Sequence, residues 1–167
     1  ANCVMVAVMT MTPLHRREHG GSAELIGLVT SVHVAGMFAF APLVGSVADR
    51  RGALPTAQAA TAMLVASAVL AAAPGHNHAV IGVALTMLGL GWSMATISGA
   101  ALMITAVPSE ERARTQGVAD MTMGIAGGAG GTVSGIVVGT VGYATLSLMG
   151  AVLAGAVLAA LFTGVFG

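Results

Sequence analysis

The sequence predicts an all-α, polytopic transmembrane helix bundle, and three observations carry this prediction. First, 56% of the 167 residues are hydrophobic and only 7% are charged, whereas a soluble domain carries about 25% charged residues. Second, the charged residues are clustered, and the apolar stretches between them have the roughly 17–25 residues that a membrane-spanning helix needs. Third, these stretches lack the period-two alternation of a membrane β-barrel.

The charged residues at the two ends of each apolar stretch define the expected membrane-spanning segments. The 24 residues between Glu24 and Asp49 form one span, and the 47 charge-free residues after Asp120 are enough for two, joined by a turn at 139–143. The expected helices lie near 1–14, 23–47, 54–74, 79–106, 116–138 and 143–165. The first would reach only roughly 21 Å into a hydrocarbon core about 30 Å thick. We therefore expect a truncated first helix, with residues 1–167 forming one transmembrane unit.

The six arginines predict the orientation of the bundle. If successive loops fall on alternate sides, two arginines lie in loop 15–22, and four lie on the opposite side in loops 48–53 and 107–115. By the positive-inside rule the second side is cytoplasmic. This predicts a multi-pass protein of the cell (inner) membrane with the Asp49 and Glu110 loops inside. The net charge is zero, so no nucleic-acid partner is expected.

The expected helix 116–138 carries a regular glycine series. Its glycines recur at four-residue spacing, at Gly127, Gly131, Gly135 and Gly139. Such a series predicts a helix face without side chains, against which another backbone packs closely. A second interpretation, compatible with the first, is that this smooth face moves against a partner during a functional cycle.

The loop after the expected helix 23–47 carries the pattern G-x-x-x-D-R-x-G, at Gly45, Asp49, Arg50 and Gly52. Gly45 would permit close helix approach, Asp49 can cap a helix N-terminus, and Gly52 allows a turn. The pattern resembles the cytoplasmic loop signature of the major facilitator superfamily. The two residues after Gly52 are Ala and Leu, where that family usually has Arg or Lys. This weakened form is more typical of the second half of such proteins.

Two further segments resemble the same half of the family. Residues 108–117 resemble the short cytoplasmic segment between the tenth and eleventh helices, and Asp120 has a counterpart in many relatives. Residues 4–15 resemble the end of the seventh helix. The resemblance covers essentially the whole chain, and it implies a C-terminal six-helix half, from late helix seven to helix twelve. Its partner would be the missing N-terminal half.

This resemblance also implies a function. It predicts a fragment of a secondary active transporter that moves a small organic molecule by rocker-switch alternating access, with a drug-like substrate and proton coupling as hypotheses. The implied partners are the lipid bilayer, the N-terminal half, the substrate and protons. The alternative is an accessory or structural multi-pass protein without transport activity. An intramembrane enzyme is less favoured, because His33 has no matching nucleophile motif.

No cofactor or metal is expected. The pair His76 and His78 stands alone, without the Cys or carboxylate cluster that a metal site needs. Tyr143 is expected to be an ordinary anchor at the membrane interface.

Six residues are candidates for a substrate or proton pathway: His33, Trp92, Thr96, Asp120, Thr10 and Thr12. His33 is either a hydrogen-bonded packing residue or a proton-linked group. Trp92 and Thr96 share a helix face, and the family resemblance places that helix, together with the helix of Thr10 and Thr12, at the central cavity. Packing within the bundle is the other interpretation. Asp120 is expected in the first turn of its helix, either as a partner of the helix dipole or in proton coupling or gating.

Overall fold

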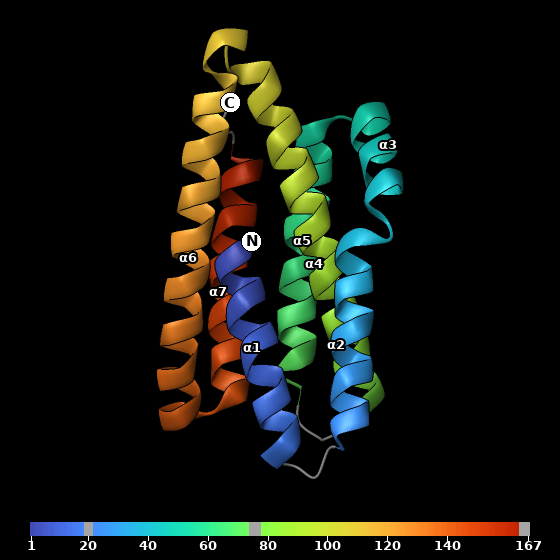
Figure 1. Cartoon of the computed structure of the whole chain (residues 1–167), viewed down its shortest axis with the longest axis vertical. Coiled ribbons are helices and arrows are strands. Elements are labelled where there is room, and N and C mark those ends of the chain that lie inside the picture. The colour runs from blue at the N-terminus through green and yellow to red at the C-terminus, as the bar shows by residue number, and fades with distance from the viewer. Residues whose placement is uncertain (19–21, 74–77, 164–167) are drawn as a thin grey trace.

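The computed structural model describes residues 1–18, 22–73 and 78–163, and within them the chain is a bundle of long helices (Figure 1). In chain order these are α1 (Asn2–Glu18), α2 (Ala23–Phe38), α3 (Ala41–Arg51), α4 (Ala53–Ala71), α5 (His78–Ala106), the 3-10 helix η1 (Ser109–Glu111), α6 (Arg112–Val141) and α7 (Tyr143–Phe162). Among the described residues, five helical stretches are long and apolar enough to cross a membrane. The predicted all-α, polytopic bundle is confirmed.

Three of the predicted helices have other bounds in the structure, and the first of them, expected at 1–14, extends to Glu18. The expected helix 23–47 is divided into α2 and α3, and α3 continues to Arg51. Pro42 lies in the first turn of α3, and because proline has no backbone N–H and crowds the preceding turn, the helix breaks before it. The expected helix 116–138 begins earlier, at Arg112, and runs to Val141. The charged segment before residue 116 therefore continues the spanning helix instead of forming a separate loop.

Two glycines make the sharp turns between consecutive helices. Gly52 joins α3 to α4 with φ 94°, and Gly142 joins α6 to α7 with φ 88°. Residues with a side chain rarely adopt this left-handed backbone conformation. Gly52 therefore allows the turn, as its place in the sequence pattern indicates.

The bundle is built around α4 and α5. α5 packs against α4 and α2, α4 also packs against α7, and α1 packs against α6 and α7. Figure 1 shows α1, α6 and α7 towards one side of the molecule and α2 and α3 towards the other. The α3–α4 turn and the α5–α6 turn lie at the same end of the bundle, and the α6–α7 turn lies at the opposite end (Figure 1). These three turns of the described chain lie at the ends where the expected alternation places them.

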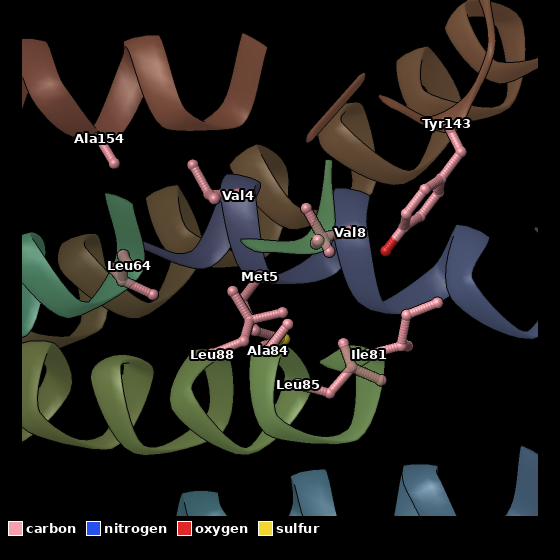
Figure 2. Packing of buried hydrophobic residues seen from close by; sticks show 11 residues of the cluster. Val4, Met5, Val8, Leu64, Ile81, Ala84, Leu85, Leu88, Tyr143 and Ala154 are labelled. Atoms are coloured by element: carbon pink, nitrogen blue, oxygen red, sulfur yellow. The ribbon is translucent and has the colours of Figure 1, made fainter. Parts of the chain in front are cut away.

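A buried apolar cluster joins α1, α4, α5 and α7 (Figure 2). Its members are Val4, Met5, Val8, Leu64, Ala71, Ile81, Ala84, Leu85, Leu88, Tyr143 and Ala154. Large apolar side chains are also exposed on the outer faces, such as Leu28, Ile136 and Val152. In a soluble protein such a surface would drive aggregation, whereas in a bilayer these side chains contact acyl chains.

The four-residue glycine series of α6 does not form one packing face. A side chain at Gly127 or Gly131 would meet α1, but Gly135 and Gly139 have no atom of the described chain within 4 Å of an added Cβ. The expectation of a single face is therefore wrong within this chain. The reason is geometric: at about 100° per residue, each four-residue step turns roughly 40° past a full turn, so Gly139 points roughly 120° away from Gly127.

The close approach between α6 and α1 lies at a different position of α6. A Cβ added to Gly130 would lie 3.0 Å from both the carbonyl oxygen and the Sγ of Cys3. Gly130 and Ser134 are buried on the same side of α6. The packing face therefore follows a mixture of three- and four-residue steps, as the helix period of 3.6 requires.

Candidate functional site

Helices α1, α5 and α6 border an open cavity of about 450 Å³, which lies within the range of about 300–1,000 Å³ that is common for small-molecule sites. Its lining is Ala1, Asn2, Cys3, Trp92, Ala95, Thr96, Ala119, Thr122, Met123 and Ala126. These residues offer an indole, an amide, two hydroxyls and small apolar groups, and no carboxylate, imidazole or guanidinium group is among them. Of the predicted pathway residues, Trp92 and Thr96 lie here.

Asn2 connects the three helices at this cavity. Its Oδ1 accepts a hydrogen bond from Nε1–H of Trp92 on α5 at 3.1 Å, and its Nδ2 donates to the carbonyl oxygen of Met123 on α6 at 2.7 Å. The sequence candidates do not include Asn2. A signal was available, however, because an amide in an otherwise apolar span is expected to pair with a neighbouring helix.

The indole of Trp92 is held from two sides. Besides its bond to Asn2, the ring makes an edge-to-face contact with Phe38 at the end of α2, with centroids 6.3 Å apart and an interplanar angle of 69°. Trp92 is partly buried. The orientation of the indole at the cavity wall is therefore fixed by the hydrogen bond that it donates to Asn2 of α1 and by its ring contact with Phe38 of α2.

The two threonines of the lining donate their hydroxyl protons to their own helices. Thr96 donates to the carbonyl oxygen of Trp92 at 2.9 Å, and Thr122 donates to that of Val118 at 2.8 Å. Each hydroxyl has one proton and two lone pairs. The oxygen atoms of Thr96 and Thr122 therefore remain available mainly as hydrogen-bond acceptors.

Thr10 and Thr12 are not among the residues that line this cavity, and they do not share a face. Thr12 is buried, donates to the carbonyl oxygen of Val8 at 2.7 Å, and lies 2.8 Å from the phenolic oxygen of Tyr143 on α7. Thr10 is exposed and donates to the carbonyl oxygen of Val6 at 2.7 Å. The two threonines therefore point to opposite sides of α1, Thr12 towards α7 and Thr10 away from it. Tyr143 is only 4% exposed, so it is a buried hydrogen-bonded residue and not a simple interfacial anchor.

His33 is fully buried where α2 approaches α5 closely. Its Nδ1 lies 2.8 Å from the carbonyl oxygen of Leu85, so Nδ1 carries the proton and donates it. Its Nε2 is buried without a hydrogen-bond partner in the described part of the chain. Two glycines permit the close approach: a Cβ on Gly36 would lie 3.0 Å from the carbonyl oxygen of Thr86, and one on Gly89 would clash with the backbone of His33.

The other histidines lie outside the described side chains: His15, His19, His76 and His78.

Comparison with known proteins identifies the family of this bundle. Residues 2–166 match the family model described as Major Facilitator Superfamily. The chain belongs to the major facilitator superfamily. Its five long apolar stretches are therefore transmembrane helices, and the chain is part of a multi-pass membrane protein.

Three relatives from two bacteria are similar to this chain. The uncharacterized MFS-type transporters YdeG and YddS of Bacillus subtilis (strain 168) are 40% identical over 151 and 154 residues, which is 90% and 92% of this chain. The riboflavin transporter RfnT of Brucella anthropi is 29% identical over 120 residues, or 72% of this chain. The chain spans about a third of the length of these relatives: 35%, 35% and 30% respectively.

The superfamily loop signature lies at the end of α3. Asp49 and Arg50 are exposed in the last turn of that helix. Asp49 does not cap the next helix, because Gly52 is the N-cap residue of α4 and no side chain bonds there, and Asp49 itself lies in the last turn of α3. An added Cβ on Gly45 would meet nothing within 4 Å in the described chain. The roles expected for Asp49 and Gly45 are therefore not realised by contacts within this chain.

Asp120 lies in the third turn of α6, because α6 begins at Arg112. The expected first-turn position is wrong, and the interaction with the helix dipole is weak this far from the N-terminus. Asp120 is exposed and accepts a hydrogen bond from Nε2 of Gln116 at 2.8 Å. Its neighbour Ala119 lines the cavity, whereas Asp120 is not among the lining residues.

Proposed function

We propose that this chain forms the C-terminal six-helix half of a secondary active transporter that moves a small organic molecule by rocker-switch alternating access. The observation that carries the proposal is the cavity between α1, α5 and α6 in a transmembrane bundle. In transporters made of two repeats, the substrate site lies near the bilayer midplane where the repeats meet. The start of α1 lies about midway along the bundle (Figure 1). The names of YdeG and YddS, MFS-type transporters, support the same proposal.

The lining of the cavity favours a neutral substrate. A charged molecule would find no opposite charge among the lining residues, and burying an unpaired charge is costly. The oxygen atoms of Thr96 and Thr122 favour a substrate with N–H or O–H donors, and the indole of Trp92 favours an apolar or aromatic portion. RfnT is named as a riboflavin transporter, and riboflavin, a neutral ring system with several hydroxyls, is therefore a suitable first probe.

Proton coupling through His33 is the second part of the proposal. Nδ1 is engaged with Leu85, so the unpartnered Nε2 is the atom that would accept a proton. His33 sits at the α2–α5 contact and outside the cavity lining. Protonation would therefore act on substrate binding through the packing of α2 against α5, and not by direct contact. Asp120, exposed on α6, is a second candidate for a proton-linked or gating role.

The proposed orientation places the Asp49 and Glu110 turns in the cytoplasm, in the cell (inner) membrane. Both turns lie at one end of the bundle (Figure 1). Asp49, Arg50 and Gly45 would then contact the N-terminal half, since they are exposed or have open space here. Reporter fusions at the two turns test this orientation: both should report the cytoplasm, and opposite locations would contradict it.

Transport is tested with the full-length protein in proteoliposomes. The probes are riboflavin and a panel of neutral aromatic compounds with hydroxyl or amide groups. We expect saturable uptake that Trp92→Ala weakens about tenfold, since one well-packed aromatic contact is worth about 1.4 kcal/mol. Val152→Ala, on the outer face of α7, is the matched control and should leave uptake unchanged. A protein that moves none of the panel would favour the accessory, non-transporting alternative.

A further inference from the structure

The amide of Asn2, on α1, hydrogen-bonds to two other helices at once. Its acceptor oxygen is used by the indole N–H of Trp92 on α5, and its donor nitrogen is used by the carbonyl oxygen of Met123 on α6. Helices α5 and α6 make few direct contacts with each other, while both border the cavity. Asn2 therefore bridges the two cavity walls through α1.

The neighbouring residues leave room for this bridge. A Cβ added to Gly127 would lie 2.7 Å from Nδ2 of Asn2, so any side chain at that position would displace the amide. Gly127 is also buried, one helical turn after Met123. The absence of a side chain at Gly127 thus lets the amide reach the backbone of α6, and this gives that glycine a role distinct from general close packing.

We propose that Asn2 is a positioning residue for substrate binding, which fixes the indole of Trp92 at the cavity wall and sets the separation of α5 and α6. This inference rests on the proposed transport function. Without Asn2, the indole N–H would lack its partner in a low-dielectric environment, and the ring would turn to find another. The substrate would then meet a wall of altered shape, so that affinity falls while the maximal rate changes less.

Two variants and one control separate this role from general packing. Asn2→Leu removes both hydrogen bonds at similar volume, and Asn2→Asp keeps an acceptor for Trp92 but removes the donor to Met123. Gln58→Leu is the matched control, because Gln58 also joins two helices through its amide, donating from α4 to the carbonyl oxygen of Leu161 at 3.1 Å, outside the cavity. All are made in the full-length transporter and compared at equal amounts of monodisperse protein.

The first measurement is the ultraviolet resonance Raman band that reports hydrogen bonding of the indole N–H. The signal of Trp92 is isolated as the difference from the same protein carrying Trp92→Phe. We expect Asn2→Leu to shift this band, and Asn2→Asp and Gln58→Leu to leave it in place. An unshifted band in Asn2→Leu would overturn the proposal, whether or not transport is detected.

The second measurement is uptake of the substrate found with the neutral panel. Asn2→Leu should raise KM about tenfold, because two hydrogen bonds of modest net value are lost. Asn2→Asp should raise KM less, and Gln58→Leu should leave it unchanged. A shifted Raman band with unchanged KM would show that the bridge is structural only and would overturn the positioning role. If the wild type moves no compound, the proposed function fails, and the Raman result alone then decides whether the bridge exists.

Discussion

The hydroxyl of Thr12 and the phenol of Tyr143 lie 2.8 Å apart, buried between α1 and α7. Because Thr12 donates its proton to the carbonyl oxygen of Val8, Tyr143 is the donor in this pair. The pair joins two helices at one end of the apolar cluster of Figure 2. It therefore contributes to the stability of the bundle and not to the cavity.

Removing this hydrogen bond should destabilise the bundle modestly. We expect Tyr143→Phe and Thr12→Val each to lower the free energy of unfolding by about 1 kcal/mol, with a coupling energy near 0.6 kcal/mol in a double-mutant cycle. Unfolding in mixed micelles measures this. Thr132→Val is the control, since Thr132 is exposed and its hydroxyl donates to the carbonyl oxygen of Gly128 within α6. Strictly additive effects of the two substitutions would contradict the pairing.

Two glycines of α6 should respond differently to alanine. Gly130→Ala places a Cβ 3.0 Å from the backbone of Cys3, so α1 must move and stability should fall by about 1–3 kcal/mol. Gly135→Ala meets open space and should be neutral or stabilising by up to about 1 kcal/mol through helix propensity. Thermal unfolding in detergent compares the two. Equal destabilisation by both would support the single glycine face that the structure argues against.

Residue spacing explains which sequence predictions failed. The exact four-residue glycine repeat suggested one helix face, but the 3.6-residue period rotates Gly139 away from Gly127. The family resemblance placed the helix of Thr10 and Thr12 at the cavity, but residues two apart on a helix point to opposite sides. Both errors were avoidable from helix geometry alone. The break before Pro42 was equally readable, because proline limits a helix on its N-terminal side.

Charge and composition account for the predictions that succeeded. The all-α bundle and the family follow from apolar stretches bounded by charges and from the loop pattern ending in Gly52. The partners of Asn2 and His33 could not be predicted, since Asn2 bonds to residues 90 and 121 positions away and His33 to one 52 positions away. Such contacts depend on how whole helices cross, which local patterns do not specify.

His33 gives a prediction about pH. If its Nε2 accepts the coupling proton, His33→Gln should flatten the pH dependence of uptake, because glutamine does not titrate. Glutamine can still donate to the carbonyl oxygen of Leu85, so packing of α2 against α5 should persist. Uptake in proteoliposomes at a series of external pH values measures the effect. An unaltered pH profile would assign His33 to packing alone.

Asp49 gives a prediction about turnover. Because Asp49 is exposed at the end of α3, its loss should not unfold this half. We expect Asp49→Asn to reduce the maximal rate while membrane insertion and melting temperature stay unchanged, since the contact proposed for Asp49 is with the N-terminal half. Glu111→Gln, exposed at the same end of the bundle, is the control. A normal rate in Asp49→Asn would remove the signature loop from the transport cycle.

The most direct test of the account asks whether the cavity between α1, α5 and α6 is the substrate path. The test starts from a full-length transporter in which every native cysteine, including Cys3, is replaced. A single cysteine is then introduced either at Thr122, in the cavity lining, or at Val152, on the outer face of α7, where that residue is 73% exposed. The account predicts that a membrane-impermeant thiol reagent labels Thr122→Cys, that substrate slows this labelling, and that Val152→Cys stays unlabelled. Equal labelling at both positions, unaffected by substrate, would contradict it.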